Sequence, residues 1–184
     1  SAYGVYVRTS YSNNIIGGSI IAIKSAAYYL QNTSTTNNFT NTNFTALRNI
    51  YFADTTSWFN YNNETSGNIW LKTNVSTASS INRTLINWSN TTIKWNDTAS
   101  VALTASYNLT GLLSSTNYNI TNGTSSQTVT TDSSGSLGVQ IVLASGVQTK
   151  INIYKINPNL YLDNRTTDIY KELGDDINIT TCAN

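Results

Sequence analysis

Alternation of apolar and polar residues over short stretches constrains the fold of this chain more than any other feature. In residues 1–12 two sets of side chains face opposite ways: Tyr3, Val5, Val7 and Thr9 against Ala2, Gly4, Tyr6 and Arg8. A period of two residues, with β-branched and aromatic side chains, is typical of a half-buried β-strand. No tight hairpin follows: Ser12-Asn13-Asn14 leads to Ile15-Ile16 and then to Gly17-Gly18, which is interpreted as a joint. The strand must therefore pair as an ordinary first strand of its own domain or with a neighbouring copy.

Further short strands are predicted along most of the chain. The alternation is clearest in residues 69–75, 84–88, 91–95, 101–107, 137–143 and 147–156. Residues 31–43 and 60–67 are polar and predict a loop and a turn, and Asp132-Ser133-Ser134-Gly135 predicts another turn. Short strands separated by turns at regular spacing predict an all-β sandwich or barrel.

Composition excludes several classes of protein. With 184 residues the chain is long enough for a core, and 39% hydrophobic content argues against disorder. A net charge of +1 with only 10% charged residues gives no basic patch for a nucleic acid. The longest apolar stretch, residues 15–30, is interrupted by Gly17-Gly18 and Lys24, so no membrane span is predicted. The chain contains no Met, and we expect a mature product released by removal of a signal peptide.

The residues do not predict an active site. The chain has no His, which removes the usual nucleophile pairs and the commonest transition-metal ligand. The one acidic cluster, Asp168, Glu172, Asp175 and Asp176, is predicted to be a solvated turn rather than a Ca²⁺ or acid–base site. The four Trp are predicted to lie in the core rather than to stack on sugars, and Cys182 to be a free thiol. We therefore expect no catalytic residues, no metal and no cofactor. With nine carboxylates and no His, the protein is also expected to tolerate acid.

Asn-X-Ser/Thr sequons, the acceptor pattern for N-linked glycans, are the most specific signal in the chain. With 27 Asn and 51 Ser or Thr in 184 residues, chance predicts about 7.5 sequons, and the chain has 14. They begin at Asn32, Asn38, Asn43, Asn63, Asn74, Asn82, Asn87, Asn90, Asn96, Asn108, Asn119, Asn122, Asn164 and Asn178. This density predicts export and a surface covered with N-linked glycans. The first strand carries no sequon, as a segment inserted into a groove requires.

A fold-level resemblance covers residues 100–156. The residues that carry it are Tyr107-Asn108-Leu109-Thr110-Gly111-Leu112, Thr116-Asn117-Tyr118 and residues 131–137. This stretch resembles fibronectin-III and immunoglobulin-like modules, although the Cys and Trp pattern of antibody domains is absent. The resemblance implies a β-sandwich of that type.

The whole chain is similar in character to a family of archaeal surface filament subunits, the Sulfolobus "thread" pilins. The similarity rests on residues 2–9, the joint at residues 13–18 and the dense sequons from Asn32 to Asn122. Such pilins assemble by donor-strand complementation, in which the terminal strand of one subunit completes the sheet of the next. The resemblance implies a donor strand and linker in residues 1–14, followed by a glycosylated sandwich domain in residues 15–184. It also implies an extracellular homopolymer of identical subunits, with roles in adhesion or biofilms.

The donor strand would comprise Ala2, Tyr3, Gly4, Val5, Tyr6, Val7 and Thr9. Among them Tyr3, Val5 and Val7 would enter the groove, and Gly4 would permit close backbone approach. Pairing of residues 3–7 within the sheet of their own chain would remove the foundation of this hypothesis.

Three alternatives remain open. A carbohydrate-binding or adhesin module of a larger surface protein predicts pairing of residues 1–12 within the chain and two or more Trp on one exposed face. A surface-layer component predicts a two-dimensional lattice. An extracellular hydrolase needs a pair of carboxylates, which is not evident in the sequence.

Overall fold

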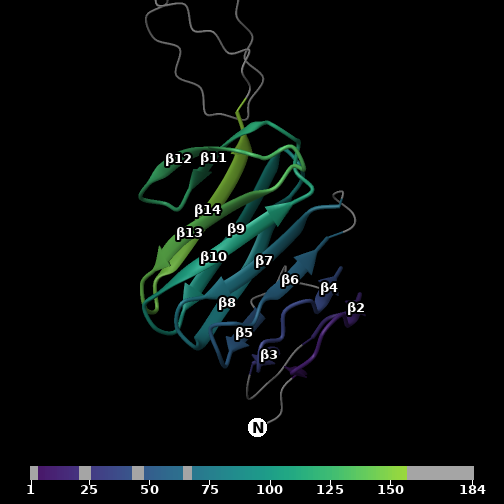
Figure 1. Cartoon of the computed structure of the whole chain (residues 1–184). Helices are drawn as coiled ribbons and strands as arrows, with labels where there is room; N and C mark the ends of the chain where they lie inside the picture. The colour runs from purple at the N-terminus through teal and green to yellow at the C-terminus, as the bar shows by residue number, and fades with distance from the viewer. Residues whose placement is uncertain (1–3, 21–25, 43–47, 64–67, 157–184) are drawn as a thin grey trace, which may run out of the picture.

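The structure, a computed structural model, describes residues 4–20, 26–42, 48–63 and 68–156, and the statements below concern these residues. They form fourteen β-strands and no helix, arranged as two sheets packed face to face (Figure 1). The predicted all-β sandwich is confirmed. The immunoglobulin or fibronectin-III subtype is not confirmed, because both sheets mix parallel and antiparallel pairs.

The larger sheet has eight strands in the order β1-β3-β5-β8-β9-β14-β11-β12. Its strands are β1 (Val5–Arg8), β3 (Tyr28–Gln31), β5 (Arg48–Phe52), β8 (Ser79–Trp88), β9 (Thr92–Ala99), β14 (Gln148–Lys155), β11 (Asn117–Thr121) and β12 (Ser126–Thr130). The other sheet has six strands in the order β13-β10-β7-β6-β4-β2. Its strands are β13 (Leu137–Leu143), β10 (Leu103–Thr110), β7 (Trp70–Val75), β6 (Phe59–Asn62), β4 (Asn38–Thr40) and β2 (Asn14–Ile16).

The first six strands form three stacked turns of a parallel β-coil, which the sequence did not lead us to predict. We call them coil 1 (residues 4–20), coil 2 (residues 26–42) and coil 3 (residues 48–63). Each coil gives one strand to the larger sheet and the next to the smaller sheet, and like strands pair in parallel. Val5 pairs with Tyr28 and Tyr28 with Ile50, so the repeat is 23 and then 22 residues long. Coil 1 therefore forms the outermost layer at one end of the sandwich (Figure 1).

The remaining eight strands pair with their neighbours in antiparallel fashion and confirm the sequence prediction most closely. Buried and accessible residues alternate without interruption along β7, β9 and β13. The turn predicted at residues 132–135 follows β12, and the Asp132 carboxylate accepts hydrogen bonds from the backbone N–H groups of Ser134 and Ser136, both at 2.8 Å. Asp and Asn side chains commonly stabilise turns in this way, by accepting hydrogen bonds from backbone N–H groups a few residues further on.

Two predictions in the coils are wrong. The polar stretch 31–43 contains β4, and the predicted turn at 60–67 contains most of β6. In these short strands the aromatic residues Phe39, Phe59 and Tyr61 point into the core beside polar neighbours. A strand of three or four residues is too short for alternation to be visible in the sequence, and pairing with the adjacent coil stabilises it instead.

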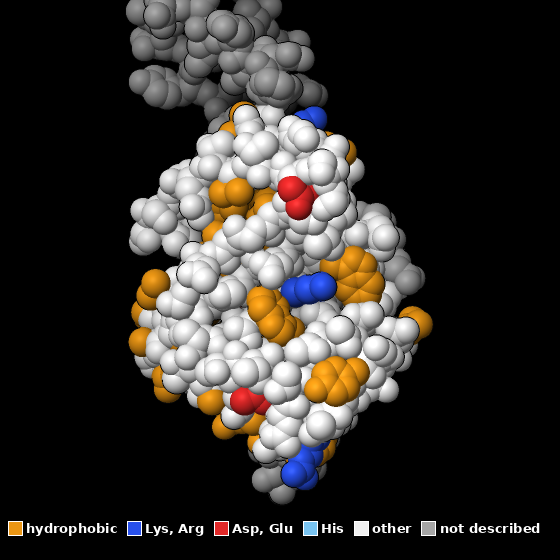
Figure 2. All heavy atoms as spheres, in the orientation of Figure 1, with side chains coloured by type: hydrophobic (Ala, Val, Ile, Leu, Met, Phe, Trp, Pro, Cys, Tyr) orange, Lys and Arg blue, Asp and Glu red, His pale blue; other side chains and the backbone are white. Residues whose placement is uncertain are grey.

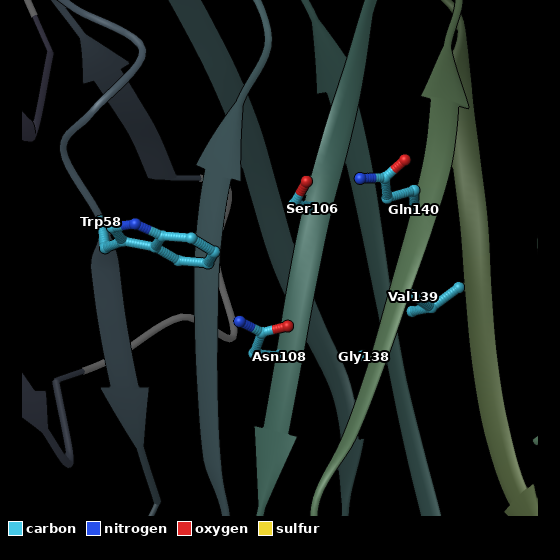
Figure 3. A pocket seen from close by; sticks show the side chains of 6 residues that line it. All are labelled: Trp58, Ser106, Asn108, Gly138, Val139 and Gln140. Atoms are coloured by element: carbon cyan, nitrogen blue, oxygen red, sulfur yellow. The ribbon is translucent and has the colours of Figure 1, made fainter.

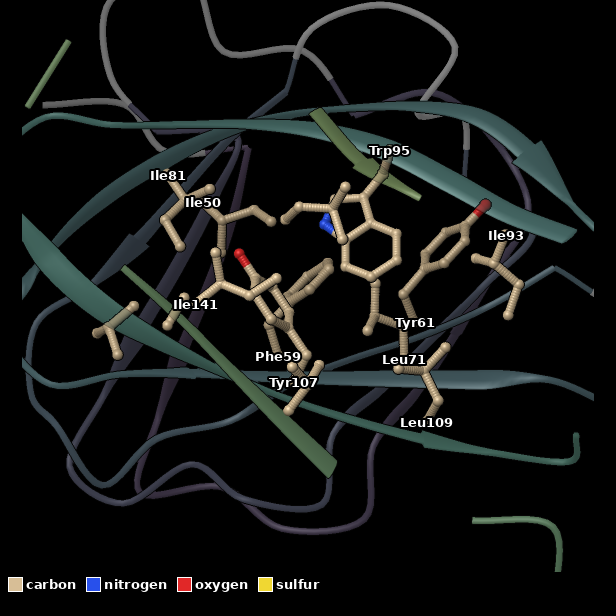
Figure 4. Close-up of a cluster of buried hydrophobic side chains, with 14 of the residues drawn as sticks. Ile50, Phe59, Tyr61, Leu71, Ile81, Ile93, Trp95, Tyr107, Leu109 and Ile141 are labelled. Atoms are coloured by element: carbon tan, nitrogen blue, oxygen red, sulfur yellow. The ribbon is translucent and has the colours of Figure 1, made fainter. Parts of the chain in front are cut away.

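The core lies between the sheets and runs through both the coils and the antiparallel strands. Side chains from the two sheets interdigitate there, including Ile50, Ile81 and Trp95 from the larger sheet and Tyr107 and Leu109 from the smaller (Figure 4). Three aromatic side chains, Tyr28, Phe39 and Phe59, pack against one another with ring centroids 4.7–5.0 Å apart. These contacts tie coils 2 and 3 to a single core, since each fully buried aromatic or aliphatic side chain contributes about 1.5–3 kcal/mol.

A buried ion pair links the two sheets inside this core. Arg83 of β8 donates from Nε and Nη2 to the carboxylate of Asp97 on β9, at 2.8 and 2.7 Å. From the opposite sheet Tyr107 donates to the same carboxylate at 2.7 Å, and Arg83 donates to Thr73 at 2.9 Å. Burial opposes the charge on Arg83, but Asp97 outweighs burial and raises the pKa of the guanidinium. Burial and the nearby carboxylate raise the pKa of Tyr107 well above its ordinary value, so it stays a donor.

Candidate functional site at the N-terminal coil

The N-terminal strand is an edge strand of its own sheet. β1 pairs in parallel with β3, from Val5 opposite Tyr28 to Arg8 opposite Gln31. The Val5 N–H donates to the Ala27 carbonyl at 2.8 Å, just before β3. The expected extended donor strand is therefore not confirmed, since residues 4–8 lie within the sheet of their own chain. Of the predicted donor residues, Ala2 and Tyr3 lie outside the described residues.

The sequence predicted that Val5, Val7 and Thr9 face the core, and this holds for the two valines within β1 but not for Thr9 after it. Val7 is buried, Val5 packs at the edge of the core, and Tyr6 is 49% exposed. Gly4 allows the chain to lie close to its own neighbouring strand, because a Cβ atom there would lie 2.7 Å from the Ala27 carbonyl oxygen. Thr9 does not continue the inward face: its φ is 44° and its side chain is exposed. The strand ends at Arg8.

Coil 2 holds coil 1 at the corner between the two sheets through one buried amide. Asn37 is fully buried, and its Oδ1 accepts hydrogen bonds from the backbone N–H of Asn13 at 3.2 Å and from the Asn13 side chain at 2.8 Å. Its Nδ2 donates to the Ser10 carbonyl at 2.6 Å. These bonds fix the position of a short loop, residues 9–13, that has no regular pairing of its own. Asn37 thus specifies how coil 1 seats on coil 2.

An outward-facing tyrosine ladder crosses the three coils. Tyr6, Tyr29 and Tyr51 occupy matching positions on β1, β3 and β5, with successive ring centroids 5.0 Å apart. The Tyr6 hydroxyl also donates to Gln31 at 2.7 Å. Stacked or tilted aromatic neighbours across strands contribute about 0.5–1.5 kcal/mol each beyond their buried area. The tyrosine ladder therefore favours the observed register between β1, β3 and β5 on the outer surface.

The joint predicted at Gly17-Gly18 follows β2 directly. Both glycines have positive φ, 74° and 78°, and a Cβ atom at either would meet nothing within 4 Å. Such backbone conformations favour glycine, and the open surroundings leave room for the chain to leave in another direction. The predicted boundary between residues 14 and 15 falls within β2 (Asn14–Ile16). The register pairs of β2 with β4 end at Ile16, and the Gly17 N–H still donates to the Thr40 carbonyl at 2.7 Å.

The sequon asparagines share one structural property. Eleven of the fourteen are described, and none of these eleven is buried. Three Asn are buried in the part of the chain that the structure describes, Asn37, Asn60 and Asn62, and none of them begins a sequon. Asn43, Asn164 and Asn178 lie outside the described residues. Accessibility of the amide is necessary, though not sufficient, for a glycan on the folded protein.

The remaining candidate residues do not come together as a catalytic or metal site in the part of the chain that is described. Trp88 and Trp95 are buried as predicted, whereas Trp58 and Trp70 lie half-buried. No group of three or more His, Cys, Asp or Glu side chains is close enough to hold a metal within the described ranges. The acidic cluster at residues 168–176 and Cys182 lie outside those ranges. No helix among the described residues is long and apolar enough to cross a membrane.

Comparisons with protein-family models, with curated proteins and with solved structures found no match to this chain. Any function is therefore inferred from the residues and their geometry.

Proposed function

We propose that this chain is the structural subunit of an extracellular, N-glycosylated filament, in which copies join head to tail by exchanging coil 1. In the filament, β1 and β2 of one subunit would occupy on the next subunit the positions that they occupy here on their own chain. The subunit would have no catalytic role, and adhesion or biofilm support would be its use at the cell surface.

The pairing of residues 4–8 within the chain removes the original foundation of the donor-strand hypothesis, which was an unpartnered leading strand. A different observation supports the proposal. One continuous N-terminal segment supplies the outermost strand of both sheets, β1 in the larger and β2 in the smaller. That segment can leave as a unit without breaking the order of any other strand. A neighbour's segment can then pair with β3 and β4 by the same contacts.

Exchange of this kind costs little at equilibrium because the contacts made between copies replace identical contacts within one copy. The segment would carry its own recognition features: Val7 for the core, Tyr6 for the ladder, and Ser10 and Asn13 for the buried Asn37 amide. Gly17-Gly18 would redirect the chain toward the neighbour. Since donor and acceptor surfaces differ, the contact is heterologous, and its repetition gives an open filament.

The positions of the sequons agree with this assignment. No sequon precedes Asn32, so the exchanged segment would be free of glycans. The described sequon asparagines are all accessible, on both sheets and the loops between them. A glycan coat over the sandwich would hinder lateral aggregation while leaving the end-to-end joint open.

Deletion of residues 2–9 tests the proposal. We expect the truncated protein to form no filaments by electron microscopy, and to bind a synthetic peptide of residues 2–9 in trans. An Arg8→Ser variant, which keeps the strand and changes only an exposed side chain, is the control and should still assemble. Filaments formed by the truncated protein would overturn the proposal. If it remains folded by circular dichroism but fails to bind the peptide, exchange of coil 1 is likewise excluded.

A second candidate function is supported by two observations. The carbohydrate-binding alternative predicts pairing of the first strand within the chain and at least two accessible Trp on one face. β1 pairs with β3, and Trp58 and Trp70 both lie half-buried on the outer face of the smaller sheet. In Figure 2, hydrophobic side chains flank a basic side chain near the middle of this face.

This second function has its own test. Binding of neutral oligosaccharides to the unglycosylated protein, measured by tryptophan fluorescence, should be lost in a Trp58→Ala, Trp70→Ala double variant. Binding that survives both substitutions would exclude this face as a sugar site.

A further inference from the structure

A shallow groove crosses the outer face of the smaller sheet beside Trp58. It has a volume of about 470 Å³ and is lined by Trp58, Ser106, Asn108, Gly138, Val139 and Gln140. Trp58 immediately precedes β6, and its indole reaches across β7 toward the amide of Asn108 on β10 (Figure 3). The groove thus places an aromatic surface next to a sequon asparagine from a strand two positions away in the sheet.

The Asn108 side chain is exposed beside this groove. No hydrogen bond to its amide is present among the described residues. It begins the sequon Asn108-Leu109-Thr110, and Thr110 lies on the same face of β10, two residues further on. Both groups that a glycosyl-transfer enzyme must reach are therefore on the groove side of the strand.

A glycine lines the side of the groove opposite Trp58. Gly138 of β13 is the register partner of Asn108. A Cβ atom at Gly138 would lie 3.0 Å from the Asn108 Oδ1 atom, closer than most side chains tolerate. The absence of a side chain at this position leaves the Asn108 amide free to adjust and keeps the groove open.

We infer that Asn108 carries an N-linked glycan whose first sugar ring packs against the Trp58 indole in this groove. The apolar face of a pyranose ring fits a flat aromatic surface, and the amides of Asn108 and Gln140 offer hydrogen bonds to its hydroxyl and acetamido groups. This inference rests on the proposed export and glycosylation of the protein and is independent of polymerisation.

The attachment requires a sugar donor of the lipid-diphosphate class and a transferase. The Asn108 Nδ2 atom forms a bond to the anomeric carbon of the first sugar. The bond from that carbon to the phosphate oxygen breaks, the lipid diphosphate leaves with the electron pair, and Nδ2 gives one proton to a base of the transferase. One N–H remains on the linked amide. No redox step is involved.

The first experiment maps glycans on the protein produced in a glycosylating archaeal host, by mass spectrometry of its peptides. We expect Asn108 to be occupied, a Thr110→Ala variant to lose this glycan, and a Thr110→Ser variant to retain it. An empty Asn108 beside other filled sequons would overturn the inference alone. If every sequon is empty, the inference and the glycosylated part of the proposed function both fail, while filament formation can still be assessed separately.

A double-mutant cycle then tests the contact with Trp58. Loss of the glycan through Thr110→Ala should lower the melting temperature by about 2–4 °C relative to Thr110→Ser. In a Trp58→Ala background the same comparison should show no difference, because the aromatic surface is gone. An equal loss in both backgrounds would contradict packing on Trp58.

A third measurement separates an attached sugar from a free one. Unglycosylated protein should show no saturable change in tryptophan fluorescence on titration with free N-acetylglucosamine oligomers. A saturable change that Trp58→Ala abolishes would assign the groove to a free saccharide and overturn the inference.

Discussion

Asn37 accepts two hydrogen bonds from Asn13, one from its backbone N–H at 3.2 Å and one from its side-chain amide at 2.8 Å. The two residues occupy the same corner of successive coils, and Asn37 is fully buried there. A buried amide with a specific partner in the neighbouring coil sets the register between coils, because any other register leaves it unpaired.

Replacement of this amide by an apolar side chain of similar size should loosen coil 1. Asn37→Leu leaves the Asn13 N–H and the Ser10 carbonyl without their partner, at a cost of about 1–3 kcal/mol. We expect a lower denaturant midpoint and fewer or shorter filaments by electron microscopy. The same substitution at the exposed Asn68 is the control and should change neither. An Asn37→Leu protein with unchanged stability and assembly would show that the corner does not specify the seating of coil 1.

Removal of one partner of the Arg83–Asp97 pair should destabilise the fold more than replacement of both partners. Asp97→Asn leaves the buried guanidinium without a counter-charge and should lower the free energy of unfolding by about 3–5 kcal/mol. The double variant Arg83→Met, Asp97→Asn should recover part of this loss, since no unpaired charge remains. Urea denaturation measures both, and an Asp97→Asn protein as stable as the parent would contradict this account.

Stability should depend little on pH above about pH 4. Burial opposes ionisation of Asp54, but hydrogen bonds from Thr56 and Ser57 outweigh it and lower its pKa. Hydrogen bonds from Ser134 and Ser136 lower the pKa of Asp132. A carboxylate whose pKa is lowered by folding stabilises the protein above its unfolded pKa, near 3.9, and loses this effect as the pH falls through the folded pKa.

Melting temperatures between pH 7 and pH 2 test this expectation. They should stay nearly constant to about pH 4 and fall below it, and an Asp54→Asn, Asp132→Asn protein should show a shallower fall. The chain has no His to titrate at higher pH. A steep loss between pH 7 and pH 5 would mean that other groups control the acid response.

Asn74 should remain without a glycan although it begins a sequon. Its Nδ2 donates to the carbonyls of Thr55 and Ser57, at 2.9 and 2.8 Å, which uses both of its hydrogens. A linked sugar would replace one hydrogen and break one of these bonds to the loop before β6. Peptide mapping should find Asn74 empty in protein in which exposed sequon sites such as Asn87 are filled. A glycan at Asn74 would show that this loop rearranges.

The sequence predicted the antiparallel strands well and the coils poorly, for one physical reason. From β7 onward most strands are at least five residues long, with one buried face, so period-two alternation is visible. In the coils the strands have three to five residues, and their stability comes from the neighbouring coil. A usable signal was nevertheless present: Val5-Tyr6-Val7 returns as Tyr28-Tyr29-Leu30 and again as Ile50-Tyr51-Phe52. A search for internal repeats finds this spacing.

The candidate sites were predictable in part. The inward face of β1, the close approach at Gly4 and the joint at Gly17-Gly18 follow from local residue types. Asn37 did not stand out, because nothing in a run of Asn and Thr distinguishes the one amide that the fold buries. Trp58 was predicted to be core, but it precedes β6 on the outward side of the strand. Its position depends on where a short strand begins, which pairing with β7 decides.

The most direct test of coil exchange is a disulfide between β1 and β3. Tyr6 and Tyr29 are register partners on the outer face, and adjacent strands lie about 4.8 Å apart, within the range that a disulfide spans. The variant Tyr6→Cys, Tyr29→Cys is made with Cys182→Ser. The matched control is Tyr29→Cys, Tyr51→Cys, whose partners belong to one chain in either arrangement.

Under oxidising conditions, assembled protein is analysed on a denaturing gel without reductant. Exchange of coil 1 predicts a series of covalent multimers for the Tyr6–Tyr29 variant and only monomers for the control. Monomers alone from both variants, with the cross-link formed, would show that β1 stays on its own chain and would contradict the account.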